Sequence, residues 1–544
     1  MKKHLLRFSA AVTVLALSVL TANAQKGTYA VTNAEIVTVS GSVISNGTVV
    51  IRDGLIESVG ANAKIPADAE VIDAEGQRVY PGFFDMNTSL GLPAPQPATR
   101  QAGGSSSPPP VSNYPQSLQA ERELIESLKG GEDQFSKYRN AGFTTVVTGT
   151  SDRIFNGNSL VINLAGETVS AMIVKAPFAH NIAFETERGG IFPTSLMGTF
   201  AAMRQMFHDA KRLDQIKSMY AKNPRGMKRP ERDITLEALM PVVKGEIPVV
   251  MFAETVREIT RALDLAEEFK LKAIIAGGNE SGKLTMRLKE MNVPVLLSLN
   301  FPVRTLAENK EADPEPLRTL RLRVEVPKNA ATLKNAGVKF AFQSGGMKNI
   351  DDFLKNAVIA TENGLSKPDA LRAMTLSSAE ILGVDSQLGS VDTGKIANLV
   401  VTDGDIFEKD TKIIHVFVDG KKFEMPKKEK SDSKPSDGDA RKVNAGGVWN
   451  ITIEPPGMSV PATLNITQSG DTITGTMTST MFGTAQIRNG EVTSNGFTFD
   501  TTVNFQGTDL ELSFTARIDG NNIEGSVDTV QGPAQFSGSR DPQK

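Results

Sequence analysis

The stretch "YPGFFDMNTSLG", residues 80–91, decides the fold. It opens on a Pro-Gly pair, continues through Phe83 and Phe84, and then carries polar side chains at Asp85, Asn87 and Ser89. The apolar start predicts a buried strand, and the three polar residues are expected near its carboxyl end. A segment rich in Pro, Gly and Ser follows at residues 93–110, where a parallel barrel carries its functional loops.

Downstream, the pattern alternates between strand and helix. Short apolar runs at 141–149, 247–254, 271–278, 293–299 and 338–344 predict strands. The run at 247–254 leads into a segment in which Val256, Ile259, Leu263 and Ala266 recur at helical spacing. Repeated strand–helix units over about 300 residues favour a parallel barrel or a doubly wound sheet.

Both flanks of this region are rich in β-branched residues broken by Gly, Asn and Asp, which indicates a small sheet built from two distant pieces. The predicted division is a composite β-sandwich from 25–80 and 384–424, an α/β (β/α)8 barrel over 81–383, and a linker over 425–444. The linker is charged and rich in Ser and Pro, as solvated spacers are.

Residues 445–544 have a different residue pattern. Short runs of Thr, Ile, Val and Phe alternate with turn signals such as "SGD", "RNG" and "IDGNN", which predicts an antiparallel meander closing into a small all-β barrel or sandwich. Gly447 and Trp449 at its start resemble the Gly-x-Trp of lipocalin-type barrels. A Trp on a first strand most often belongs to the core.

Composition limits the function. Residues 1–24 combine a basic start, a short apolar core and Ala22-Asn23-Ala24, as in a cleaved secretory signal, so a periplasmic or secreted location is expected. The chain has no cysteine, which excludes disulfides, thiolate ligands and a Cys nucleophile. A net charge of -3 gives no positive electrostatic potential that would attract nucleic acid. No later apolar run predicts an integral membrane segment.

Several of these stretches resemble one family. Residues 80–91 resemble the Pro-Gly-Phe-Ile-Asp-x-His-x-His signature of the amidohydrolase superfamily, close to its imidazolonepropionase-like and dihydroorotase-like members. Residues 141–147 are similar to the second barrel strand of that family, and "LGSVDTGKIANLVV" (388–401) resembles its closing motif. The resemblance implies a TIM-like barrel, a divalent metal at the strand ends, and hydrolysis of C–N bonds in cyclic amides, ureas, N-acyl groups or dipeptides.

The chain departs from that pattern wherever the family holds its metal. Asn87 and Ser89 stand at the two histidine positions of the first strand. The resemblance places the fifth- and sixth-strand histidines at Phe252 and Gly277, and the catalytic aspartate at Gly345. Neutral imidazole and carboxylate hold Zn²⁺ and lower the pKa of bound water, whereas Asn and Ser suit hard cations better. We therefore expect a substituted metal centre and no cofactor, with a divalent metal such as zinc as the alternative.

Other sites are weaker. A makeshift cation site from Asp85, Asn87, Glu254 and Glu280 is conceivable, although Asp85 at such a turn more often accepts backbone hydrogen bonds. "GGNESGKL" (277–284) nearly spells a phosphate loop, but Leu284 replaces the Mg²⁺-binding Ser or Thr. A milder version, in which backbone N–H groups and Lys283 hold an anionic ligand group, stays open.

The sequence indicates neither a serine nucleophile nor a set of histidine ligands. Ser344 lacks the first glycine of a nucleophile elbow, and Ser195 does not match that motif either. His180, His208 and His415 show no ligand spacing and are expected to be ordinary core or surface residues. The candidate pocket residues are accordingly Asp85, Asn87, Ser89, Phe252, Glu254, Gly277, Glu280, Lys283, Ser344 and Gly345.

Three functions remain in contention. The leading hypothesis is a metal-depleted envelope protein that binds a small amide- or peptide-like ligand, or that acts as a partner subunit of an intact homologous amidohydrolase. The second is an active hydrolase with atypical ligands. The third is an interaction protein in which the terminal β domain supplies the working surface.

Overall fold

The computed structural model describes residues 27–93, 114–130, 132–166, 168–186, 192–302, 316–347, 349–409, 411–425, 444–454, 460–493, 496–505, 508–529 and 532–540. The predicted signal segment lies outside these residues, as do nearly all of the predicted linker and most of the loop after residue 93. The chain divides into two compact units, Met1–Pro426 and Lys427–Lys544. Each is described by itself.

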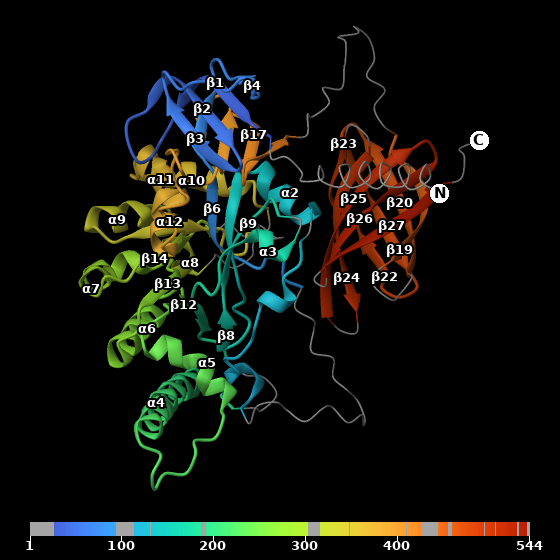
Figure 1. Cartoon of the computed structure of the whole chain (residues 1–544). Coiled ribbons are helices and arrows are strands. Elements are labelled where there is room, and N and C mark those ends of the chain that lie inside the picture. Colours follow the sequence, from blue (N-terminus) through green and yellow to red (C-terminus); the bar gives the residue numbers. More distant parts are fainter. Residues whose placement is uncertain are drawn as a thin grey trace, which may run out of the picture. The chain divides into compact units, whose positions relative to one another are not determined.

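The first unit carries a sheet made from both flanks of the barrel. Its strands are β1 (Tyr29–Ile36), β2 (Ile44–Arg52), β3 (Leu55–Gly60), β4 (Glu70–Asp73), β5 (Arg78–Pro81), β16 (Leu399–Thr402), β17 (Ile413–Val418) and β18 (Lys421–Glu424). They pair in the order β18-β17-β16-β5-β1-β2-β3, with β4 beside β1. Figure 1 labels β1 to β4 and β17 of this sheet. The flanking domain is therefore composite, as the sequence predicts.

The prediction of a sandwich needs correction, because hydrogen bonds join all eight strands into one sheet. The register of β1 against β2 shifts between Val31 and Ala34, and Asn33 there has φ +58°. A bulge of this kind bends a strand and increases its twist. One bent sheet therefore encloses its own core, which includes Val31, Ile51 and Phe417.

The barrel is built on parallel strands. They are β6 (Phe83–Thr88), β7 (Phe143–Thr148), β11 (His180–Ala183), β12 (Val249–Ala253), β13 (Ala273–Gly277), β14 (Val295–Ser298) and β15 (Phe340–Gln343). Strand β6 runs parallel to β7, the strands from β11 to β15 run parallel in chain order, and β15 lies beside β6. The apolar side chains between them form the barrel interior, with Phe84, Val250 and Ile274 among them.

The chain does not form eight identical strand–helix units. Between β7 and β11 it makes β8 (Phe155–Asn158), β9 (Leu160–Asn163) and β10 (Ile173–Lys175); β9 pairs antiparallel with β7, and β8 pairs antiparallel with β11. The connection from β8 to β9 is a single residue, Ser159. Since β8 and β9 each run antiparallel to a barrel strand, Ser159 marks the point at which the chain passes from one sheet to the other without turning back.

The helices cover the outer side of the strands (Figure 1). Their bounds are α2 (Glu132–Asn140), α3 (Val169–Met172), α4 (Leu196–Lys222), α5 (Ile234–Val243), α6 (Val256–Phe269), α7 (Thr285–Glu290), α8 (Leu317–Glu325), α9 (Asn329–Ala336), α10 (Asp352–Glu362), α11 (Lys367–Met374) and α12 (Leu376–Leu382). Helix α6 follows β12 and packs on β12 and β13. Within the described ranges, no helix is long and apolar enough to cross a membrane.

A buried polar cluster joins the sheet to the barrel. Asn398 Nδ2 donates to Thr145 Oγ1 and to Asn163 Oδ1, both at 3.1 Å, while its Oδ1 accepts from the Asp419 N–H at 2.8 Å. Asn163 Nδ2 donates in turn to Asp419 Oδ1 at 2.6 Å. Asn398 belongs to the closing motif of the sequence, so the motif has a structural reason: a single amide satisfies groups from both layers.

The second unit is a closed antiparallel barrel. Its strands are β19 (Gly447–Glu454), β20 (Val460–Ser469), β21 (Thr472–Ser479), β22 (Gly483–Gln486), β23 (Arg488–Thr493), β24 (Gly496–Phe505), β25 (Thr508–Asp519), β26 (Asn522–Thr529) and β27 (Gly532–Arg540). The sheet runs from β20 through β19 and β27 round to β21, and the pairing of β20 with β21 closes it. This confirms the meander that the turn signals predict.

The interior of this barrel is filled by apolar side chains from every strand, including Trp449, Phe514 and Phe536. Trp449 is fully buried, and its Nε1 donates to the Ala445 carbonyl at 2.9 Å. The Arg540 guanidinium lies 4.4 Å from the centre of the indole ring and donates to the carbonyls of Asn444 and Gly446. The first and last strands are thereby locked together at one end.

Candidate functional site

A cavity of ≈550 Å³ opens at the carboxyl ends of the barrel strands. Its polar and apolar lining comes from the ends of β6, β7, β12, β13 and β15. The lining residues are Asn87, Thr88, Ser89, Tyr138, Gly149, Thr150, Ser151, Asp152, Phe252, Glu254, Gly277, Gln343, Ser344, Gly345, Gly346 and Met347. Seven of the ten candidate residues are therefore brought together: Asn87, Ser89, Phe252, Glu254, Gly277, Ser344 and Gly345.

Asp85 does not line this cavity. It is fully buried, and its Oδ1 accepts from the backbone N–H groups of Asn87 at 3.2 Å and Ser344 at 2.9 Å. The backbone role proposed for it is confirmed, and the makeshift cation site is wrong on this residue. Its Oδ2 has no hydrogen-bond partner among the described residues. Burial raises the pKa of Asp85 to about 6, and the hydrogen bonds from Ser344 and Asn87 oppose that rise.

The hydrogen bond from the Ser344 N–H to Asp85 connects the last strand of the barrel to the first. It joins β15 to β6 across the point where the chain closes on itself. The register of β6 against β7 shifts between Asp85 and Thr88, so the end of β6 departs from regular pairing there. Asp85 is buried against the backbone, whereas Asn87 and Ser89 line the cavity.

Sequence reasoning missed Tyr138, which lies on α2 and reaches the cavity wall. Burial raises the pKa of Tyr138 well above its usual value, and the nearby Asp85 carboxyl adds to that rise. A hydrogen bond with Ser344 works in the opposite direction. The phenol is therefore neutral at physiological pH. Nothing in the local sequence distinguishes it from an ordinary helix tyrosine, since its approach to β15 is a tertiary contact.

Asp152 was also missed, and it follows the end of β7. Its carboxylate accepts from Arg122 Nη1 at 3.0 Å and lies 3.9 Å from Arg153 Nε. The side chains of Arg122 and Arg153 are only 32% and 24% exposed. The charge of Asp152 is therefore compensated within the protein.

Glu254 occupies the space in which a side chain at position 277 would stand. Gly277 has φ +96°, and a Cβ built on it would lie 2.3 Å from Glu254 Oε1. Glu254 Oε2 accepts from the Asn279 N–H at 3.2 Å, which holds the carboxylate over the end of β13. Desolvation raises the pKa of Glu254, with the charge of Glu258 adding to the effect. The end of β13 is built around a glycine and a neighbouring carboxylate.

Gly345 repeats this arrangement on β15. It has φ +62°, and a Cβ there would lie 2.1 Å from Ser298 Oγ and 3.1 Å from Ser298 Cβ. Ser298 is buried, and its Oγ accepts from the Asn300 N–H at 3.1 Å. A left-handed backbone disfavours any residue with a Cβ. Both positions are therefore closed to a longer side chain by backbone conformation and by neighbours.

Glu280 and Lys283 lie outside the mouth. They line a separate cavity of ≈250 Å³ together with Asn279, Gly282, Glu325, Lys328, Asn329 and Thr332. Lys283 Nζ lies 3.1 Å from Glu280 Oε1 and 3.0 Å from Glu325 Oε2, and Glu280 Oε2 accepts from the Val256 N–H at 2.9 Å. The prediction of an anion-holding loop is corrected, because two carboxylates already neutralise Lys283. Glu280 therefore does not belong to the makeshift cation site either.

The described histidines are far from this chemistry. His180 is fully buried in β11, and its Nδ1 lies 3.1 Å from Asn158 Oδ1. Burial lowers the pKa of His180 to about 4, so the ring is neutral. His208 lies on α4 with 62% of its side chain exposed, and His415 belongs to β17. As expected, none of the three lines the mouth.

The donor groups at the mouth do not fit a transition-metal ion. An amide, a hydroxyl, a phenyl ring and two glycines stand where the resemblance implies imidazole and carboxylate. Of the two described carboxylates that line the mouth, Glu254 accepts a backbone hydrogen bond and Asp152 is paired with Arg122. In the described part of the chain, no three His, Cys, Asp or Glu side chains come together as a metal would require. The residues that the structure brings together would leave such an ion without its preferred ligands.

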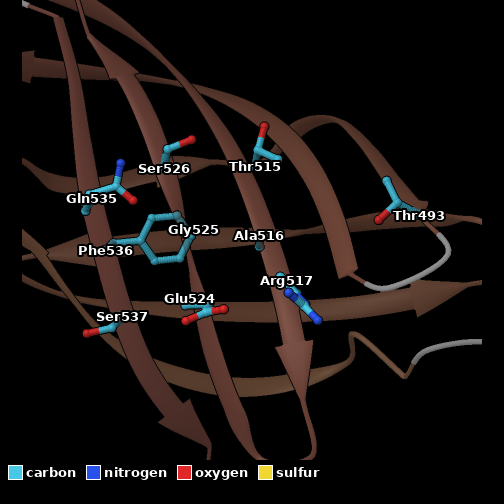
Figure 2. Close-up of a pocket in the computed structure, with 10 residues that line it drawn as sticks. All are labelled: Thr493, Thr515, Ala516, Arg517, Glu524, Gly525, Ser526, Gln535, Phe536 and Ser537. Atoms are coloured by element: carbon cyan, nitrogen blue, oxygen red, sulfur yellow. The ribbon is translucent and has the colours of Figure 1, made fainter. Parts of the chain in front are cut away.

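The C-terminal barrel has a cavity of its own, of ≈770 Å³, on strands β23, β25, β26 and β27. Figure 2 shows its lining, with the Phe536 ring reaching over Gly525 and the polar side chains of Thr515, Arg517 and Glu524 around it. Arg517 and Glu524 stand directly opposite each other in the ladder of β25 and β26. The Phe536 ring takes the space of a side chain at Gly525, because a Cβ there would lie 2.8 Å from the ring.

Comparison with known proteins adds three findings. Residues 251–423 match the model of the Amidohydrolase family. The "Amidohydrolase tasK" of Hapsidospora irregularis is 21% identical over 403 residues, which span 69% of this chain but only 39% of that relative. The crystal structure of an amidohydrolase from Thermotoga maritima MSB8 is 25% identical, with a TM-score of 0.61 over 73% of this chain and 100% of that one.

Proposed function

The chain belongs to the amidohydrolase superfamily, and from this premise we propose that its barrel mouth binds a small amide-, urea- or peptide-like ligand without activating a metal-bound water. The family model and the Thermotoga maritima amidohydrolase support the fold on which this rests, a TIM-barrel-like domain with a flanking domain. The proposal concerns what the substituted site does.

The observation that carries this proposal is the state of β13 and β15. The two positions at which the resemblance implies a histidine and an aspartate, Gly277 and Gly345, are glycines in the left-handed region whose side-chain space is filled by Glu254 and Ser298. Loss of a ligand by a single substitution would leave an empty, ordinary backbone position. A remodelled backbone is better explained by selection for a different use of the same mouth.

The mouth keeps the properties of a ligand site. Its volume of ≈550 Å³ falls within the range of small-molecule pockets, roughly 300–1,000 Å³. Phe252 and Met347 supply apolar surface, whereas Asn87, Ser89 and Thr150 supply hydrogen-bonding groups. Amides, ureas and peptide bonds each offer a donor and an acceptor of this kind.

We further propose a periplasmic or secreted location, supported by the basic, apolar and small-residue order of residues 1–24. A role as partner subunit of an intact homologue remains part of the proposal. Isolation of the tagged full chain from its native envelope fraction tests it, and recovery of an intact amidohydrolase in stoichiometric amount would favour docking over independent ligand binding.

The decisive experiment measures turnover and binding on one sample. The full chain, purified without chelator, is screened against N-acyl amino acids, hydantoins and dipeptides with and without added Zn²⁺ and Mn²⁺. We expect saturable binding by calorimetry for part of this panel and no product with either metal. Ser89→Trp, which fills the mouth from an exposed position, is expected to abolish binding, whereas Ser170→Trp on the exposed face of α3 is expected to leave it unchanged.

Metal-dependent turnover would refute the proposal and favour an active hydrolase with atypical ligands. The double variant Asn87→His, Ser89→His offers a further check. We expect it to gain no stoichiometric metal, because β13 and β15 still present Gly277 and Gly345. Firm metal uptake by this variant would mean that only the first strand had changed.

A further inference from the structure

The charged side chains that line the barrel mouth in the described residues are all acidic. Among its described lining residues, the acidic side chains are Asp152 and Glu254, and neither Lys nor Arg is present. The phenol of Tyr138 is neutral because its pKa is raised. The described wall is thus acidic, and the two carboxylates differ in how well they are compensated.

Asp152 is already paired, as described above, with Arg122 at 3.0 Å and Arg153 at 3.9 Å. Glu254 differs from Asp152, because its Oε2 accepts a hydrogen bond from the backbone N–H of Asn279 at 3.2 Å. No ion pair engages Glu254 within the ranges that the structure describes. A carboxylate that lines a cavity without a paired cation attracts a cationic ligand group, and an ammonium group there can form a charge-assisted hydrogen bond with it.

The Glu254 carboxylate lies against Gly277 at the wall of the ligand space. Oε1 is the atom that comes within 2.3 Å of a Cβ built on Gly277, at the end of β13. Gly277 itself lines the mouth, so the carboxylate lies over the floor that this glycine leaves open. Phe252, two residues earlier on β12, faces the same cavity with an aromatic ring. Carboxylates and aromatic faces both attract ammonium groups.

We infer that the mouth selects ligands carrying a protonated amino group, which Glu254 accepts beside the ring of Phe252. This inference rests on the proposed ligand-binding function and names the ligand class more narrowly: a small peptide-like or amide-containing molecule with a free amine. The neutral amide and hydroxyl side chains of the wall hold its remaining polar atoms.

Matched ligands test the role of charge. A panel of dipeptide amides with small, aromatic and acidic side chains is measured by calorimetry against the full chain, beside the N-acetylated form of each member. Acetylation removes the positive charge and leaves the rest of the molecule intact. We expect the free amine to bind at least about tenfold more tightly, equivalent to about 1.4 kcal/mol.

Two glutamate variants complete the test. Glu254→Gln keeps the size of the side chain, and we expect it to reduce the preference for the amine to less than threefold. Glu280→Gln removes a carboxylate that lies outside the mouth, and we expect it to keep the preference of the wild type.

The possible outcomes distinguish a failure of the inference about the amine from a failure of the proposed ligand binding. Equal or tighter binding of the acetylated forms would overturn the inference while leaving ligand binding in place. Retention of the preference in Glu254→Gln would also overturn it, since Glu254 would then not be the acceptor. Failure of every panel member to bind would remove the proposed function, and the inference with it.

Discussion

Replacing Asp85 by Asn is expected to remove a specific pH dependence from the stability of the first unit. Oδ1 of Asp85 accepts two backbone hydrogen bonds, and Oδ2 has no partner among the described residues. An Asn side chain can keep both bonds through its own Oδ1. The substitution therefore removes a titrating group from a buried position with little change of shape.

The magnitude follows from the two pKa values. The pKa of Asp85 is raised from 3.8 to about 6 in the folded chain, so between these values the native state holds a proton that the unfolded state releases. Stability contributed by this group consequently rises as the pH falls through 6, and it levels off below 3.8. Between pH 8 and pH 4.5, the wild type should gain about 2 kcal/mol relative to Asp85→Asn.

The two units allow this to be measured separately within the full chain. All helices in the described ranges belong to the first unit, and the single tryptophan, Trp449, belongs to the second. Urea unfolding followed by circular dichroism at 222 nm therefore reports the first unit, and tryptophan fluorescence reports the second. The fluorescence transition should be the same in both proteins, which makes it an internal control.

A difference below about 0.5 kcal/mol between the two pH values, or one of opposite sign, would refute this reasoning. It would mean that Asp85 stays ionised at pH 4.5, as a carboxylate does when it is paired with a cation. Such a result would also weaken the description of the barrel mouth as lacking a cation site.

Three further predictions concern stability. Asn398→Ala should cost the first unit about 2–4 kcal/mol, because it removes the three hydrogen bonds that Asn398 makes with Thr145, Asn163 and Asp419; an unchanged 222 nm transition would show that the cluster is not needed. The pKa of His180 is lowered from 6.5 to about 4, so below pH 6.5 the unfolded state takes up a proton that the native state does not. Acidification to pH 4.5 should therefore cost the wild type about 2–3 kcal/mol more than His180→Gln, and equal losses in the same urea experiment would contradict the buried neutral ring. Arg540→Ala should destabilise the second unit by about 2 kcal/mol through loss of its carbonyl bonds and its contact with Trp449; the fluorescence midpoint should fall while the 222 nm midpoint stays constant, and no fall would mean that the strands close without it.

Local features of the fold were predictable from the sequence because their causes are local. Helix α6 runs Val256–Phe269, and the spacing of Val256, Ile259, Leu263 and Ala266 indicated it in advance. Its start is fixed by a reciprocal cap between Thr255 and Glu258. The turn signals of the last hundred residues likewise predicted an antiparallel meander, since each turn depends on a few neighbouring residues.

The site was predictable only in part. The ends of the parallel strands converge in any such barrel, so Asn87, Phe252, Glu254 and Gly345 were expected together and lie together. The isolation of Lys283 could not be foreseen, because its partner Glu325 comes from a helix more than forty residues later in the chain.

The same limit applies to the fine structure of the mouth. The placement of the Glu254 carboxylate depends on the left-handed backbone at Gly277, and Tyr138 reaches the wall through packing of α2. Neither the backbone angle nor the packing is encoded in a short pattern of residues. Predictions made from strand ends therefore located the mouth, but they could not say which side chains fill it.

Metal content is the most direct test of the central claim, which is that the remodelled strand ends cannot hold a catalytic ion. The full chain is purified without chelator from cells supplied with zinc, manganese, nickel and iron, and the metals are quantified per chain by mass spectrometry beside an intact amidohydrolase prepared in the same way. We expect only trace metal in this chain and stoichiometric metal in the control. One firmly bound divalent ion per chain, retained through gel filtration, would contradict it.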